Sequence, residues 1–245
     1  MLAIPPPVTP VAMTAMTTDS SLYRLMTWLS PAFPVGGYSY SHGIETAVDE
    51  GRIAGAEHLQ TWIEGILAFG ALHVDAVLLR EAWEAVTAED VGAFTRTAER
   101  AETLRATAEL GLESAAQGRA FLDTVRATSP DPRLDRWAQV MAEAEREPAY
   151  SVAVGLVAAV AAIPTRSTLI AYVHAGVANL VSAGVRHIPL GQTQGQTIMA
   201  NLESTVAETV EAALNTAPED LGAAAVMVDW CSARHETQRV RLFRS

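Results

Sequence analysis

Apolar residues recur at helical spacing along nearly the whole chain. Leu22, Leu25, Met26 and Leu29 lie three or four positions apart, which predicts a first helix from about residue 20 to the Ser-Pro pair at 30–31. The same spacing predicts further helices at 39–51, 59–87 (one long or two collinear), 90–128 (weakest at Gly111), 133–146, 149–163, 166–186, 192–214 and 219–233.

No stretch alternates apolar and polar residues with the β-branched enrichment of a strand. No fixed-period repeat occurs, and no linker after residue 20 is polar enough to separate two domains. The pattern therefore predicts one all-α domain of about eight to ten helices over residues 20–233. The proline-containing stretch 1–19 is expected to be a disordered leader, and 234–245 a separate C-terminal tail.

Composition narrows the class of protein. The chain has 245 residues, of which 49% are hydrophobic and 18% charged, as in a globular protein. All 17 basic residues are arginine, and the absence of lysine excludes a Walker A lysine, a Schiff-base lysine and a lysine general base. A net charge of −11 argues against nucleic-acid binding, which needs a basic face.

Two further observations concern the compartment. Cys231 is the only cysteine, so no intrachain disulfide is possible, and a buried structural role is expected for it. The longest apolar run, 152–163, is too short to cross a bilayer. We expect a cytoplasmic protein without membrane contact.

The tail has a composition opposite to that of the rest. Residues 234–245 carry four arginines and one acid, with Val240, Leu242 and Phe243 between the arginines. Arginine and aromatic residues are enriched at protein interfaces, so the tail is interpreted as a docking segment. The alternative is a frayed, solubilising terminus.

The stretch 33–45 is the first internal segment that could carry chemistry. Gly36 and Gly37 precede Tyr38 and Tyr40, in a loop that matches neither the dinucleotide nor the phosphate-loop pattern. A binding surface is preferred here to a purely structural turn. His42 and Glu45, three residues apart, could share a helix face as an acid–base pair, which leaves a small helical enzyme as the alternative function.

A second segment, 188–197, contains a Pro-Gly break and three glutamines, including Gln192 and Gln196. Glutamine has no titratable group, so this segment suits binding or helix capping rather than proton transfer. The six histidines are scattered and form no H-x-x-x-H pair, so no metal site and no cofactor are predicted.

Three separated segments together resemble one family. They are 29–45 (LSPAFPVGGYSYSHGIE), 189–196 (PLGQTQGQ) and 235–245 (HETQRVRLFRS). In this order and at these separations they are similar to the urease accessory protein UreF family, over about residues 22–245. Gly111 and Gln117 depart from the family pattern, so no role is assigned to the helix at 107–118.

The resemblance implies an all-α homodimer that is not an enzyme. It further implies a scaffold between accessory protein D/H and the GTPase accessory protein G, and the assembly delivers nickel to apo-urease. Modulation of GTP hydrolysis by the partner is a secondary hypothesis, which would rest on an exposed arginine that reaches the nucleotide. The positions that match the family as partner contacts are Arg241, Leu242, Phe243, Arg244 and Ser245. The loop with Gly36, Gly37, Tyr38 and Tyr40 would lie close to the dimer or partner surfaces, and Gln192 and Gln196 are also expected to bind a partner. Arg241 is expected to pair with a partner carboxylate or backbone carbonyls, and Leu242 and Phe243 to fill a partner groove.

Overall fold

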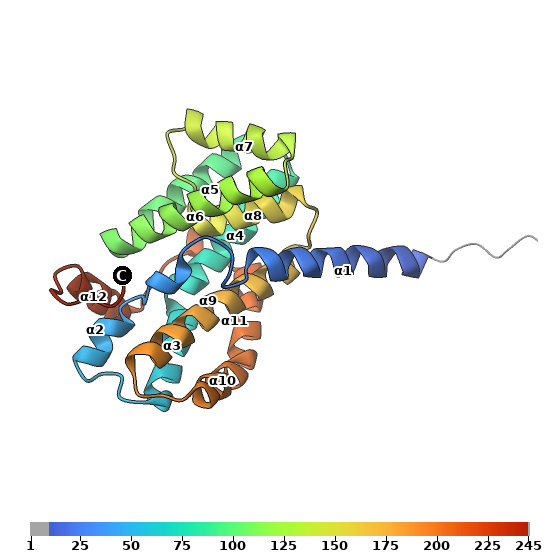
Figure 1. Cartoon of the computed structure of the whole chain (residues 1–245). Helices are drawn as coiled ribbons and strands as arrows, with labels where there is room; N and C mark the ends of the chain where they lie inside the picture. Colours follow the sequence, from blue (N-terminus) through green and yellow to red (C-terminus); the bar gives the residue numbers. More distant parts are fainter. Residues whose placement is uncertain (1–9, 245) are drawn as a thin grey trace, which may run out of the picture.

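The computed structural model describes residues 10–244, with side chains from Asp19 onward. The described chain is all-α, which confirms the predicted fold class (Figure 1). Its α-helices are α1 (Pro10–Trp28), α2 (Ile44–Asp49), α3 (Ala56–Phe69), α4 (Ala71–Thr87), α5 (Val91–Thr103), α6 (Ala108–Thr128), α7 (Pro132–Glu143), α8 (Tyr150–Val160), α9 (Thr165–His187), α10 (Gln192–Asn201), α11 (Glu203–Asn215) and α12 (Val226–His235). Two short 3₁₀ helices, η1 (Gly37–Ser39) and η2 (Pro218–Asp220), complete the set.

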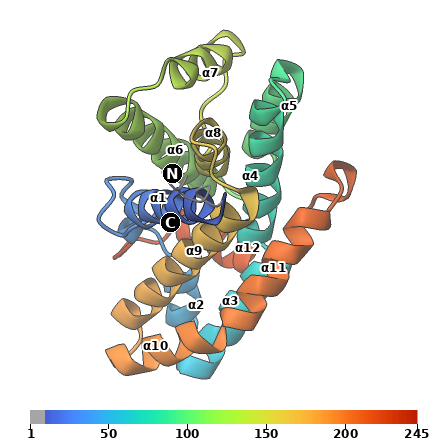
Figure 2. The same ribbon diagram turned by 90° about the vertical axis from the view of Figure 1, so that its right-hand side faces the viewer.

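Helices α4 and α9 form the centre of the molecule. α4 contacts α3, α5, α8, α9 and α11, and α9 contacts helices as far apart in the sequence as α1 and α11. Figure 2 shows α9 and α11 running side by side, with α1 near one end of α9. One continuous apolar core extends from Leu25 in α1 to Cys231 in α12, and the buried role expected for Cys231 is confirmed.

Helices α6 and α8 approach each other through a glycine. A Cβ atom built on Gly118 of α6 would lie 1.7 Å from the carbonyl oxygen of Pro148, just before α8. Only a residue without a side chain allows this approach. The arrangement brings Phe121 of α6 to the ring of Tyr150 of α8, with 5.7 Å between the ring centroids.

Two predicted helices are each split in the structure. The predicted 90–128 helix is wrong, because the chain breaks between Thr103 and Ala108 rather than at Gly111. Thr107 begins α6 by accepting a hydrogen bond from the amide of Leu110 (3.3 Å), as an N-cap residue does. The predicted 192–214 helix bends at the fully buried Leu202, which lets α10 pack on α3 while α11 packs on α4.

The ends of the chain also differ from the expectation. α1 begins at Pro10 rather than near residue 20, because 11–18 contains no proline or glycine and proline fits the first turn of a helix. The rest of the predicted leader, 1–9, lies outside the described residues. At the other end, α12 starts at Val226 instead of 219 and continues to His235.

Two described segments are long and apolar enough to cross a membrane, 56–87 and 165–187. The most apolar window of the first is 61% buried inside the fold, and that of the second is 50% buried. These segments are the helices α3, α4 and α9, so their apolar surface serves the core of the molecule.

Candidate functional site

The C-terminal segment after α12 folds back onto the chain that carries it (Figure 1). We call residues 236–244 the tail. The amide of Arg244 donates to the carbonyl oxygen of Ser39 (2.7 Å), and Phe243 is only 4% exposed. The segment predicted as a tail, 234–245, thus begins within α12, and Ser245 lies outside the described residues.

A buried carboxylate holds the tail backbone. Glu45 of α2 accepts hydrogen bonds from the amides of Leu242 (2.6 Å) and Phe243 (2.9 Å). Its side chain is 3% exposed, and its Oε2 also lies 3.1 Å from Nε2 of His235. Hydrogen bonds to a charged acceptor are stronger than neutral ones, and so Glu45 fixes two successive tail residues.

A second carboxylate extends this network. Nδ1 of the fully buried His235 lies 2.7 Å from Oε2 of Glu109 in α6, and Arg241 reaches Oε1 of the same carboxylate at 2.5 Å. Glu45, His235, Glu109 and Arg241 therefore form one connected chain of contacts. We call these residues the tail clamp.

The ring of Phe243 occupies a slot at the end of α9. The guanidinium carbon of Arg186 lies 4.5 Å from the ring centroid, and His187 contacts the ring edge-on at 6.4 Å between centroids. Burial lowers the pKa of Arg186. His187 is oriented by Asp49 of α2 (2.9 Å), so the slot is built from both α2 and α9.

A glycine lets α12 approach α2. Gly43 has φ +77° at the start of α2, a conformation that side chains disfavour, and a Cβ atom there would lie 2.8 Å from the amide nitrogen of Ser232. This close contact brings His235 of α12 within reach of Glu45. The sequence segment around residue 43 therefore positions the tail clamp.

The outer face of the tail remains exposed. It consists of Arg239, Val240, Arg241, Leu242 and Arg244, and we call it the outer tail face. Val240 is 84% exposed and Leu242 60% exposed, although both are apolar. Isolated exposed apolar residues are common, but two beside three arginines on a fixed backbone form a surface suited to a protein partner.

The predicted loop at 36–40 adjoins the tail. Gly36 has φ +73° and immediately precedes η1, in which the carbonyl oxygen of Ser39 accepts from the amide of Arg244. Tyr38 is 70% exposed, whereas Tyr40 is 8% exposed. Burial and the nearby Glu113 raise the pKa of Tyr40, opposed by Arg244 of the tail.

The two glutamines predicted as contacts lie elsewhere. Gln192 and Gln196 are exposed on α10, which packs against α3, α9 and α11. Gln194 between them caps the helix by accepting from the amide of Gly191 (2.9 Å). The structure therefore joins the loop and the tail, and leaves the glutamines as a separate surface.

The acid–base pair of the alternative enzyme is not formed. Nε2 of His42 lies 2.9 Å from Glu113 of α6, while Glu45 binds His235 and the tail. His42 itself has φ +52° and lies before α2 rather than within a helix, so it does not share a helix face with Glu45. In the described part of the chain, no group of three or more His, Cys, Asp or Glu side chains is arranged to hold a metal ion.

The side chains outside the tail that hold it in place, which we call the tail seat, are Glu45, Asp49, Glu109, Arg186, His187 and His235. Sequence reasoning missed most of them. Asp49, Glu109, Arg186 and His187 carry no local motif, and each becomes part of the seat only through packing of α2, α6 and α9. The only sequence feature that could have pointed to these residues is the His-Glu pair at 235–236, which lies in the C-terminal segment that resembles the family.

Comparison with known proteins identifies the family. The UreF family model matches residues 53–203. A urease accessory protein UreF from Granulibacter bethesdensis is 45% identical over 234 residues, covering 96% of this chain and 98% of the relative. The chain belongs to the UreF family of urease accessory proteins.

Other relatives with the same name match this chain over similar lengths. The UreF of Rhodopseudomonas palustris strain HaA2 is 47% identical, covering 92% of this chain and 94% of its own length. The UreF of Magnetococcus marinus is 44% identical, and the match covers 94% of this chain and 100% of the relative. Each of these relatives matches more than nine-tenths of this chain. As a member of the UreF family, this protein is an accessory protein and not an enzyme.

Proposed function

We propose that this chain acts in the cytoplasm as a homodimeric scaffold for urease maturation. It binds accessory protein D/H and the GTPase accessory protein G, and the assembly inserts nickel into apo-urease. Membership of the UreF family supports the role in urease maturation. The absence of a formed His42–Glu45 pair agrees with a role in assembly rather than in catalysis.

The exposure of the outer tail face is the observation that best supports the proposed contact with D/H. Covering Val240 and Leu242 would remove two exposed apolar side chains from water, which favours binding by roughly 3–6 kcal/mol before ordering costs. Arg239 and Arg244 are exposed beside them and can bind carboxylates or carbonyls of the partner.

Because the tail is bound to its own chain, fewer of its residues can contact the partner than we expected. We expected Leu242 and Phe243 to enter a partner groove together, but Phe243 is buried against its own chain and only Leu242 faces outward. With the backbone held by Glu45, less conformational entropy is lost when the partner binds. Phe243 thus acts as an internal anchor that presents Leu242.

Two further surfaces belong to the proposal. The loop with Gly36, Gly37, Tyr38 and Tyr40 lies beside the tail and would extend the D/H contact, with Tyr38 as its exposed aromatic side chain. Gln192 and Gln196 are exposed on α10 and would contact a different protein of the assembly.

The test separates the outer tail face from the fold. We expect deletion of residues 241–245, or the double substitution Val240→Asp with Leu242→Asp, to abolish capture of D/H in a pull-down. Helical content measured by circular dichroism should stay unchanged. Val91→Asp, at an exposed helix start far along the chain, is the matched control and should bind normally. Full capture by the double variant would refute the proposed D/H contact.

A modulating effect on GTP hydrolysis is a second part of the proposal. An exposed arginine can stabilise charge on a transferring phosphoryl group, and Arg239 and Arg244 are exposed. Single-turnover hydrolysis by accessory protein G, with and without this chain, measures the effect.

A further inference from the structure

Helix α12 is joined to two other helices through the ring of His235. This ring is fully buried, and each of its nitrogens faces a carboxylate. Nε2 lies 3.1 Å from Oε2 of Glu45 in α2, and Nδ1 lies 2.7 Å from Oε2 of Glu109 in α6. Both distances lie within hydrogen-bond range, so the number of protons on the ring decides whether both contacts are attractive.

Hydrogen-bond chemistry sets this number. An ionised carboxylate only accepts, whereas a neutral imidazole has one N–H donor and one bare acceptor nitrogen. With a neutral ring, one nitrogen would place its lone pair against a carboxylate oxygen at 2.7 or 3.1 Å. Only the imidazolium, which has an N–H on both nitrogens, donates to Glu45 and Glu109 at the same time.

The two carboxylates bind other donors, which favours their ionised form. Glu45 accepts from the amides of Leu242 and Phe243, and Glu109 accepts from Arg241 at 2.5 Å. Hydrogen bonds to the charged form of a group stabilise that form. The additional proton therefore resides on the ring and not on either carboxylate.

The charge balance of the tail clamp requires the same proton. Glu45 and Glu109 bring two negative charges, and Arg241 brings one positive charge. With a neutral ring, this largely buried cluster would keep one negative charge without a partner, which costs desolvation energy. With an imidazolium, the four side chains of the tail clamp are neutral as a set.

The other charged groups beside the tail clamp make contacts of their own. These contacts are Asp49 with His187, Glu50 with Arg52 and Arg234, and Glu236 with the backbone amides at 108 and 109. Arg52 and Arg234 are matched by Glu50 and Glu236. These surroundings therefore add no net positive charge that could replace the imidazolium.

We propose that His235 holds one proton between Glu45 and Glu109, and that this proton latches α12 and the tail onto α2 and α6. When α12 separates from these helices, the ring enters water, where histidine has a pKa of about 6.5 and is mostly neutral above about pH 7. Docking of α12 then takes up a proton. The docked form is therefore fully stabilised below about pH 6.5 and loses this stabilisation as pH rises.

The latch belongs to this chain alone. It rests on contacts among the described residues, so it can be tested without D/H and does not depend on the proposed contact. Only one consequence, a weaker capture of D/H as pH rises, rests on the proposed function, because the docked tail presents the outer tail face.

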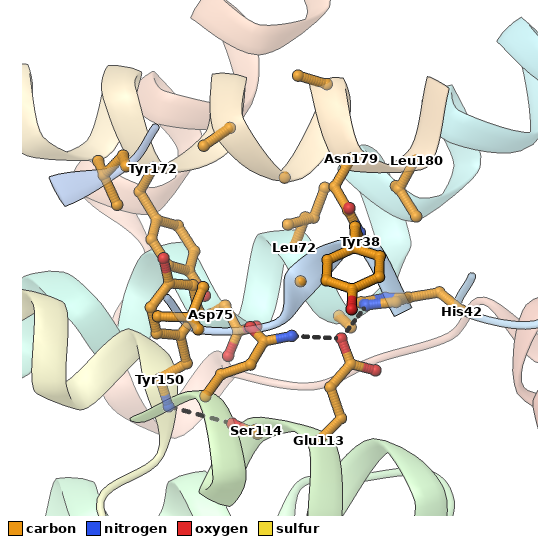
Figure 3. A pocket seen from close by; sticks show the side chains of 18 of the residues that line it. Tyr38, His42, Leu72, Asp75, Glu113, Ser114, Tyr150, Tyr172, Asn179 and Leu180 are labelled. Atoms are coloured by element: carbon orange, nitrogen blue, oxygen red, sulfur yellow. Dashed lines mark hydrogen bonds and ion pairs between the residues drawn. The ribbon is translucent and has the colours of Figure 1, made fainter. Parts of the chain in front are cut away.

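A second pair of histidine and glutamate lies one turn further along α6. Glu113 lies 2.9 Å from His42, in the wall of a cavity of about 270 Å³ between α4, α6 and α9 (Figure 3). Burial lowers the pKa of His42, but Glu113 and Asp75 outweigh this effect against Arg105, and the net pKa is raised. This pair also loses a proton as pH rises, so a test of the latch has to separate it from His235.

NMR of the ring nitrogens counts the protons directly. In long-range ¹H–¹⁵N spectra of the full chain at about pH 7.5, we expect both nitrogens of His235 to carry a proton, although an ordinary histidine is about nine-tenths neutral there. Burial lowers the pKa of His73, which provides a neutral reference ring in the same spectrum. The His235 signals are those that disappear in His235→Gln. A ring with one proton in the unsubstituted chain would overturn the proposal.

Glu109→Gln removes one charge from the latch and keeps its shape. The introduced amide can donate to an unprotonated Nδ1 and accept from Arg241, so a neutral ring makes every contact. We expect the His235 ring of this variant to carry a single proton at about pH 7.5. Glu113→Gln makes the same change one turn further along α6 and is the matched control, in which the His235 ring should keep two protons. Two protons in both variants would contradict the bridge.

Hydrogen–deuterium exchange measures the docking of α12. Protection factors, which correct for the intrinsic pH dependence of exchange, are compared at the amides of Ser232 and His235. Between about pH 6.5 and about 8.5, protection should fall by up to about tenfold for each pH unit, because docking takes up one proton. The fall should persist in Glu113→Gln and disappear in Glu109→Gln. Protection that stays constant or rises with pH in the unsubstituted chain would show that no proton latches α12.

Discussion

At the scale of single residues, Glu45 has the greatest influence on the tail. Its local sequence suggested an acid–base partner for His42, yet the folded chain uses its two oxygens to bind backbone amides 197 and 198 positions away and to contact His235. A carboxylate in this position acts through geometry and charge rather than by transferring a proton.

We expect Glu45→Gln to loosen the tail without unfolding the body. Amides bonded to a charged acceptor lose about 1.5–3 kcal/mol when that acceptor is removed, so exchange of the Leu242 and Phe243 amides should accelerate tenfold or more. Hydrogen–deuterium exchange measures this directly, and trypsin should cut after Arg241 faster. Glu208→Gln, at an exposed position on α11, should leave both rates unchanged. Unaltered exchange in the Glu45 variant would show that the tail is held by Phe243 instead.

At the scale of elements, close helix approach decides the architecture. α6 and α8 can pack as they do only because Gly118 has no side chain. The helical periodicity of these segments was evident, but periodicity does not specify how near two helices come. Similarly, the break before α6 is set by the Thr107 cap, whose hydroxyl lies 2.9 Å from that of Ser232 in α12.

We expect Gly118→Ala to reduce the free energy of unfolding by about 1–3 kcal/mol or more, because the added carbon overlaps the carbonyl of Pro148. Gly65→Ala in α3 is the matched control: nothing lies within 4 Å of its Cβ, and alanine should stabilise the helix by about 0.5–1 kcal/mol. Urea denaturation of both variants measures the difference. Equal stability of the two variants would mean that α8 shifts away from α6 at little cost.

At the scale of the whole molecule, charge is distributed unevenly. The chain carries a net −11, whereas the outer tail face contributes three exposed arginines. The tail clamp neutralises Arg241 with Glu109, so Arg239 and Arg244 carry most of the field that a partner meets.

We therefore expect the proposed complex with D/H to weaken as salt increases from 0.05 to 0.5 M, since exposed charges are screened beyond ~4 Å at the higher concentration. Replacing Arg239 and Arg244 with glutamine should flatten this dependence. The control variant, Arg133→Gln with Arg136→Gln, removes two charges from α7 and should keep the salt dependence of the complex unchanged. Surface plasmon resonance over a salt series is a suitable measurement, and a salt-independent complex would argue for a purely apolar contact.

Much of this protein could be predicted from its sequence alone. The all-α class follows from helical periodicity, which is a local property. The family was predicted from three segments of the sequence and is confirmed by the family model over residues 53–203 and by relatives that cover nearly the whole chain. Helix ends set by a local cap or stop were also close to the expectation: α7, α8 and α9 begin within one residue of their predicted starts.

Only the tertiary structure determines which side chains hold the tail in place. Glu45, Glu109 and His235 are brought together by α2, α6 and α12, and no sequence spacing encodes that meeting. Burial of Phe243 by Arg186 and His187, and the cavity between α4, α6 and α9, likewise arise from packing between distant segments. Local periodicity fixes which residues form a helix, but side-chain partners depend on the free energy of packing the whole chain.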